Sequence, residues 1–172
     1  AGTETQRDQR NWSTNRTAID GDNTESCVTG SDNATLDGFF IQNGYADHDN
    51  GCGMHNYETS PVVANCTFTE NMAFYGSGAG MYNAYSSPIL INCTFSENTA
   101  MYEQYGGGMY NFNSSPSLIN CIFFQNMVTN TDSSSYGGGM YNESSSPTLT
   151  SCIFVGNVAR NDRNAASYGG GM

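Results

Sequence analysis

The segment GGGMYNFNSSPSLINCIFFQN, residues 106–126, decides the fold because close copies of it recur along the 172-residue chain. Aligned on the methionine of each copy, through to Met172, the repeats start 27, 28, 31 and 32 residues apart. A Cys follows each of the first four methionines after 12 residues, a Phe follows two residues later, and an Asn three residues after that. Self-similarity of this period is typical of solenoids, whose repeats stack on their neighbours. The repeated positions are Met54, Met81, Met109 and Met140; Cys66, Cys93, Cys121 and Cys152; Phe68, Phe95, Phe123 and Phe154; and Asn71, Asn98, Asn126 and Asn157.

Each repeat reads as three short strands separated by turns. Met81 and Asn83 alternate with Tyr82, which predicts a strand with its tyrosine outward. The following Ser-Ser-Pro interrupts this strand, since Pro has no N–H to donate. The segment ILINCTF, residues 89–95, predicts two more strands joined at Asn92, a residue type that tolerates the left-handed conformation. We therefore expect an all-β, right-handed parallel β-helix of about 27–32 residues per coil, with Met, Leu or Val, Cys and Phe ladders inside.

The expected organisation is a cap-like opening segment, residues 1–35, followed by β-helix repeats over residues 36–172. All length variation falls between the last Asn of one repeat and the next Met, which predicts one variable loop on the same side of every coil. Two other repeat folds fit this sequence less well. A leucine-rich repeat would need several leucines per unit, and helical repeats would need long segments without Gly and Pro.

The pairing of a Gly-Gly-x-aliphatic tetrapeptide with Phe-x-x-Asn resembles the repeat of the polymorphic outer-membrane proteins of chlamydiae. It also resembles a broad group of secreted bacterial right-handed β-helix proteins. The motifs here are GAGM and GGGM, with FTEN, FSEN, FFQN and FVGN, and the resemblance covers Leu36 to Met172. The opening segments GTETQRDQRNW and AIDGDN look like the start of the secreted group. The resemblance implies an extracellular or cell-surface location and a role in adhesion or passive structure, although Met replaces the usual aliphatic residue.

The charge distribution excludes two classes of partner. The formal net charge is −11, with 16 Asp and Glu against five Arg and no Lys, and the arginines lie at positions 7, 10, 16, 160 and 163. Nucleic acids and anionic membranes both attract basic patches, so we expect neither partner. No apolar run is long enough to insert in a membrane. The acidic surface is interpreted as solubilising; alternatively, the basic ends contact acidic flanks of a neighbouring subunit, or divalent cations screen the acid.

An outward aromatic stripe is the first candidate binding surface. Tyr82, Tyr110 and Tyr141 share one position of the repeat, and His55 holds the same position in an earlier copy. Stacked tyrosines could bind sugar rings or a partner sheet. The alternative is that the rings only pack on one another and stabilise the stack.

The densest group of potential metal ligands is DHDNGCGMH, residues 47–55. Asp47, Asp49 and Asn50 precede a Gly, as at the start of a calcium loop, but the glutamate that would close an EF-hand is missing. A zinc site that combines the two histidines with Cys52 matches no known ligand spacing. We therefore keep calcium as a possible ion beside the interpretation of this segment as a polar turn, and expect no other cofactor.

The cysteines divide into two sets. The four repeated ones predict a column of small apolar residues at a tight corner. The spacing of stacked neighbours, about 4.8 Å, permits disulfides within this column, but in-register side chains point the same way, which gives a poor torsion. A buried column without histidine does not predict a metal site. Cys27 and Cys52 lie outside the column and could pair with each other across adjacent coils.

These patterns favour a non-catalytic extracellular structural protein, a fibre or filament subunit that stacks on itself head to tail. An adhesin or carbohydrate-binding module of a larger surface protein is the alternative. A polysaccharide lyase or hydrolase is the distant third, because glycoside hydrolysis needs paired carboxylates and the acids here are scattered, as at Glu70, Glu97 and Glu143. We therefore do not expect an enzyme.

Overall fold

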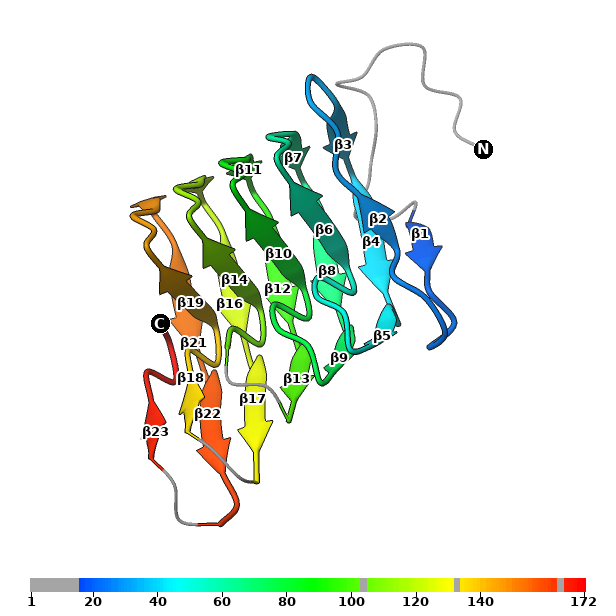
Figure 1. Ribbon diagram of the computed structural model, residues 1–172. Helices are drawn as coiled ribbons and strands as arrows, with labels where there is room; N and C mark the ends of the chain where they lie inside the picture. The colour runs from blue at the N-terminus through cyan, green and yellow to red at the C-terminus, as the bar shows by residue number, and fades with distance from the viewer. Residues whose placement is uncertain (1–15, 103–104, 132–133, 164–165) are drawn as a thin grey trace.

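The computed structural model describes residues 16–102, 105–131, 134–163 and 166–172. Within these ranges every regular element is a β-strand, and the strands run parallel in a solenoid of about five turns (Figure 1). Identical residues of successive coils pair in register, as Met81 does with Met54 and Met109. The predicted parallel β-helix is therefore confirmed.

Four long sheets run along the stack. The first, sheet A, contains β1 (Thr17–Asp20), β4 (Phe39–Gln42), β8 (Thr67–Thr69), β12 (Thr94–Ser96), β16 (Ile122–Phe124) and β21 (Ile153–Val155). Sheet B contains β2 (Val28–Thr29), β6 (Met54–Tyr57), β10 (Met81–Ala84), β14 (Met109–Phe112) and β19 (Met140–Glu143). Sheet C contains β3 (Thr35–Asp37), β7 (Val62–Ala64), β11 (Ile89–Ile91), β15 (Ser117–Ile119) and β20 (Thr148–Thr150). The strands of the opening segment thus join the same sheets as the repeats.

The fourth sheet corrects the prediction of three strands per coil. Sheet D contains β5 (Tyr45–Asp47), β9 (Met72–Phe74), β13 (Thr99–Met101), β17 (Met127–Asn130) and β22 (Val158–Asn161), in the segment that the sequence suggested to be loop. A further pair, β18 (Ser135–Tyr136) and β23 (Ser167–Tyr168), extends two of these segments. The inward residues of sheet D are small, Ala73, Ala100 and Val128, and they form a second buried cluster. Because these inward residues are small and vary from coil to coil, no large residue recurs at fixed spacing, and the sequence pattern did not reveal this strand.

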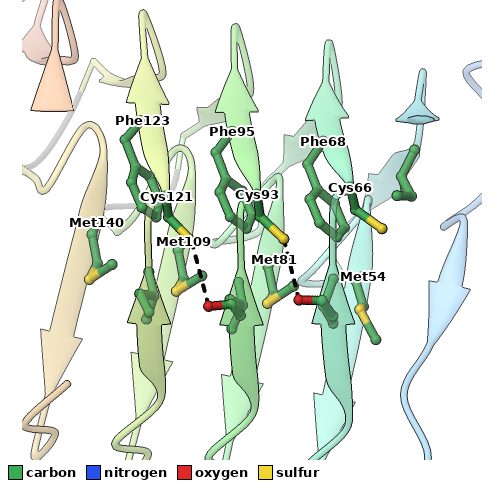
Figure 2. Close-up of a cluster of buried hydrophobic side chains, with 14 residues drawn as sticks. Met54, Cys66, Phe68, Met81, Cys93, Phe95, Met109, Cys121, Phe123 and Met140 are labelled. Carbon is green, nitrogen blue, oxygen red and sulfur yellow. Dashed lines mark hydrogen bonds between the residues drawn. The ribbon is translucent and has the colours of Figure 1, made fainter. Parts of the chain in front are cut away.

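The main core consists of the predicted ladders (Figure 2). The rings of Phe68, Phe95, Phe123 and Phe154 stack with centroids 4.8, 4.7 and 4.6 Å apart and planes within 5° of parallel. These distances equal the usual spacing between paired strands. They therefore measure the rise from one coil to the next at this side of the solenoid.

The corners use left-handed backbone, as expected at Asn92, whose φ is 54°. The residues stacked on it, Asn65 and Asn120, have φ values of 52° and 53°. Close backbone approach explains the glycines before each methionine: a Cβ on Gly80 would lie 2.5 Å from the carbonyl oxygen of Gly108. The Gly-Gly-Met motif is therefore a packing requirement between successive coils.

Two ladders of buried asparagine run through the interior. The corner ladder comprises Asn71, Asn98, Asn126 and Asn157, and the strand ladder comprises Asn56, Asn83, Asn111 and Asn142 on sheet B. From Asn98 onward each Oδ1 of the corner ladder accepts from both the backbone N–H and the Nδ2 of the preceding asparagine. Each Nδ2 of this ladder also donates to a Phe or Ile carbonyl. In the strand ladder each Nδ2 donates to the next Oδ1 at 2.8 Å.

Candidate functional site

The tyrosine stripe predicted from the sequence is present on the outer face of sheet B. The ring centroids of His55 and Tyr82 are 5.2 Å apart, those of Tyr82 and Tyr110 are 5.3 Å apart, and those of Tyr110 and Tyr141 are 5.7 Å apart. Each ring contacts the next through tilted or edge-on packing, a favourable arrangement for aromatic pairs. The stripe is therefore a continuous aromatic ladder along the stack.

The stripe is less exposed than the sequence suggested, because Tyr110 is only 8% exposed. Its hydroxyl donates a hydrogen bond to Oε2 of Glu143 at 2.7 Å, and the ring of Tyr105 lies 5.5 Å away. Burial, and then the bond to Glu143, raises the pKa of Tyr110 well above its usual value. The expectation of an exposed stripe was therefore wrong at Tyr110, where Tyr105 of the variable segment packs against the ring.

A second tyrosine column lies beside the stripe. Tyr105, Tyr136 and Tyr168 stack with centroids 5.7 and 5.1 Å apart, and Tyr105 also contacts Tyr141 at 4.6 Å. Sequence reasoning missed this column, although each of its tyrosines directly precedes a Gly-Gly-Gly-Met segment. A hollow of about 200 Å³ opens next to the column. Its lining residues are Tyr136, Gly137, Tyr141, Asn142, Tyr168, Gly169 and Met172.

A third aromatic group lies at the end of sheet D. His48 and Tyr75 stack with centroids 4.7 Å apart and planes 5° from parallel, and Tyr75 and Tyr102 stack at 5.1 Å. All three residues occupy left-handed corners, with φ values of 62°, 53° and 64°. The group is solvent-exposed, since the His48 side chain is 71% exposed and Tyr75 is 41% exposed.

The residues proposed for calcium binding each contact a protein group. Oδ1 of Asn50 accepts from the backbone N–H of Ser77 at 2.7 Å, and Oδ1 of Asp49 accepts from the N–H of Asn50 at 2.8 Å. Asp47 lies 3.6 Å from the imidazole of His48. Among the residues that the structure describes, no three His, Cys, Asp or Glu side chains gather as a metal site would require. Calcium binding by Asp47, Asp49 and Asn50 stays a prediction.

Cys27 and Cys52 lie on adjacent coils, where the N–H of Cys27 donates to the carbonyl of Cys52 at 2.8 Å. Both are free thiols in the structure, so the suggested disulfide is not formed. The physical reason is direction: Cys27 packs against the main core, with its Sγ 3.4 Å from the Gln42 carbonyl, whereas Cys52 packs into the alanine-lined cluster of sheet D. The four repeated cysteines are also free and line the main core.

The charged groups are distributed rather than clustered. Glu70 and Glu97 occupy left-handed corners of successive coils. Arg160 pairs with Asp162 at 2.9 Å within the chain, and the guanidinium of Arg16 lies 4.4 Å above the ring of Phe40. The arginines at positions 7 and 10, and the segment GTETQRDQRNW, lie outside the described residues.

The chain matches no protein-family model, no curated protein and no solved structure. In the described part of the chain there is also no helix of the length and hydrophobicity needed to cross a membrane.

Proposed function

We propose that this chain is a structural β-solenoid of the cell surface or extracellular space that extends by stacking coil upon coil, including between copies. One observation carries the proposal: among the described residues β20, β21 and β22 are the outermost strands of their sheets, and they offer the edge that interior strands use for pairing. Leu149 on β20 and Phe154 on β21 are only partly buried, whereas the equivalent Leu118 and Phe123 are 0% exposed. A further coil on this edge would bury these rungs and continue the parallel register.

The residues that the repeat holds constant support a structural role. The repeated Phe, Cys and Asn side chains pack or hydrogen-bond with the same residues of neighbouring coils. Their recurrence is thus accounted for by the stack itself. The extracellular or surface location rests on the resemblance of the repeat to secreted β-helix proteins.

Electron microscopy and sedimentation of the purified chain test the proposal. We expect rods several times longer than one chain, with a length distribution that grows with protein concentration. Short particles of uniform length at every concentration would overturn self-stacking.

A matched pair of variants locates the contact. Leu149→Lys places a charge on the inward rung of β20, which stacking would bury, and should abolish rod growth. Thr148→Lys places the same charge on the exposed outer face of the same strand and should leave rod growth unchanged. Equal rod growth by both variants would exclude this edge as the contact.

A second candidate function is glycan binding, favoured by the hollow beside Tyr136, Tyr141 and Tyr168. Tyrosine rings combine an apolar face with a hydroxyl, which suits the mixed surface of a sugar. A glycan array compares the wild type with Tyr141→Ala and with Tyr57→Ala, a 56% exposed tyrosine of the same sheet outside the hollow. We expect loss of glycan signal with Tyr141→Ala alone, and an array without signal for the wild type would exclude this function.

A further inference from the structure

The four repeated cysteines occupy equivalent positions in four successive coils. Each Sγ lies 3.1–3.5 Å from the carbonyl oxygen two residues earlier and 3.5–3.8 Å from a carbonyl oxygen of the preceding coil. Figure 2 shows the thiols of Cys66, Cys93 and Cys121 in line along the stack and pointing the same way. Because their surroundings repeat, the separation between neighbouring sulfurs follows the rise of the coil.

That rise is known at this place, since each cysteine lies two residues before a stacked phenylalanine. The phenylalanine centroids are 4.6–4.8 Å apart. A disulfide requires sulfurs about 2 Å apart and a torsion near a right angle, which parallel side chains do not supply. A metal ion with two thiolate ligands on opposite sides requires sulfurs separated by two metal–sulfur bonds of about 2.3 Å each, or about 4.6 Å.

The direction of the bonds also fits. Side chains stand roughly perpendicular to the stacking axis, so an ion midway between two sulfurs makes a near-right angle with each Cβ–Sγ bond. Bent geometry at sulfur is normal for metal thiolates, and no particular torsion between the two side chains is needed. The arrangement that is wrong for a disulfide is therefore right for a linear sulfur–metal–sulfur bridge.

We propose that this cysteine ladder binds soft, two-coordinate d10 metal ions such as Hg(II), Ag(I) and Cu(I), each ion bridging the thiols of two successive coils. The sequence alone argued against metal at a buried column without histidine, but soft ions prefer sulfur and need only two ligands. A site with two ligands is also compatible with the finding that, in the described residues, no three potential ligands gather.

The reaction balances without a redox partner. Hg(II) replaces the two S–H protons of a neighbouring pair, forms two Hg–S bonds and releases two protons, which leaves a neutral bridge. A monovalent ion stays neutral when it displaces one proton and binds one thiolate and one thiol. Neutrality matters because these thiols are buried among apolar side chains, where a net charge is costly.

The column sets the number of ions. In the coil that precedes Cys66 the equivalent position is held by Phe39, so the cysteine ladder begins at Cys66. Cys152 is the partly exposed member of the ladder. Four thiols form two neutral Hg(II) bridges, Cys66 with Cys93 and Cys121 with Cys152. Binding displaces protons from these thiols and should therefore tighten as pH rises.

The test is a titration of the folded chain with mercuric chloride, followed by native mass spectrometry, with two double variants that each keep two ladder thiols. Cys66→Ala/Cys93→Ala retains an adjacent pair and should bind one Hg(II) at the ladder. Cys93→Ala/Cys152→Ala retains two thiols separated by an empty coil and should form no bridge, so any mercury taken up there is held by one thiol and keeps a chloride. The wild type should hold two bridging ions at the ladder, and Cys27→Ala/Cys52→Ala should keep both because those thiols lie outside the column.

X-ray absorption of the wild type loaded with mercury gives a readout that does not depend on any variant. We expect two sulfur neighbours per ion at about 2.3 Å. Equal numbers of chloride-free bridged ions in the two double variants, three or four sulfur neighbours, or binding only after unfolding in urea would overturn the proposal. Circular dichroism before and after loading establishes that the folded protein was measured.

Discussion

The two asparagine ladders end differently at the first coils of the solenoid. The corner ladder ends at Gly44, whose backbone N–H donates to Oδ1 of Asn71 at 2.9 Å, so the terminal acceptor is satisfied. The strand ladder ends at Gly30, and Oδ1 of Asn56 is buried there without a hydrogen-bond partner. An internal ladder therefore needs a terminator, and the chain supplies one in the first case and leaves the second open.

The ladders also differ in the number of bonds per rung. The side chain of Asn98 makes four hydrogen bonds, through Oδ1 to the N–H and Nδ2 of Asn71 and through Nδ2 to Phe68 and Asn126. The side chain of Asn83 makes two, one to each neighbour. The corner ladder thus fixes the backbone of the turn as well as the side chains, while the strand ladder joins side chains only.

The largest expected effect comes from breaking the corner ladder. Asn98→Ala leaves several buried donors and acceptors without partners, and we expect a loss of about 4 kcal/mol in the free energy of unfolding. Asn83→Ala should cost about 2 kcal/mol because it removes half as many bonds. Urea denaturation of both variants measures the difference, and equal losses would show that bond number does not separate the two ladders.

The second prediction concerns the closed end. A Cβ on Gly44 would overlap the carbonyl oxygen of Cys52 and lie 2.7 Å from its carbonyl carbon, both backbone atoms that cannot rotate away. Gly44→Ala should therefore cost about 3 kcal/mol, at the upper end for overpacking. The matched control is Gly30→Ala, where the three atoms nearest the added Cβ belong to the side chains of Asn56 and Thr59. Thermal unfolding that ranks Gly30→Ala as the more damaging change would contradict this account.

The third prediction is a dependence on alkaline pH at the same closed end. Burial raises the pKa of Cys52 from 9.0 to about 12. Between these values the unfolded chain loses the proton that the folded chain keeps, so stability is complete below pH 9 and falls as pH rises toward 12. At about 1.4 kcal/mol per pH unit, the titration of this thiol lowers the free energy of unfolding by about 2 kcal/mol at pH 10.5.

Cys52→Ala isolates that contribution, because Ala79 already holds the equivalent position in the next coil. Urea denaturation at pH 8 and at pH 10.5 should show a smaller loss of stability for the variant than for the wild type. Parallel losses in the two proteins would mean that Cys52 does not titrate on unfolding.

The sequence predicted the ladders of Phe, Cys and corner Asn because large or chemically distinct residues recur at fixed intervals. It could not predict sheet D, whose inward residues, such as Ala73 and Val128, are small and varied. It also missed the burial of Tyr110, because the covering ring of Tyr105 belongs to the segment whose length changes from coil to coil. Fixed spacing reports on contacts between equivalent positions, whereas contacts between different positions need the folded coil.

The smallest expected effect comes from closing the open end of the strand ladder. Gly30 holds the position before Asn56, since Val28 pairs with Met54, and its φ is not in the left-handed region. Gly30→Asn would bring an Nδ2 group to the unpaired Oδ1 of Asn56. The side chain of Asn56 must rotate to make room for the new Cβ. We expect a gain of about 1 kcal/mol, the usual net value of one buried hydrogen bond.

Gly30→Asp provides the control because it has nearly the same shape but brings an acceptor in place of the donor. It should be less stable than the wild type at neutral pH, since a carboxylate would face the oxygen of Asn56 in a buried position. If Gly30→Asn and Gly30→Asp changed the urea midpoint equally, the gain would come from filling space beside Asn56, and the unpaired acceptor would not be what distinguishes the open ladder from the closed one.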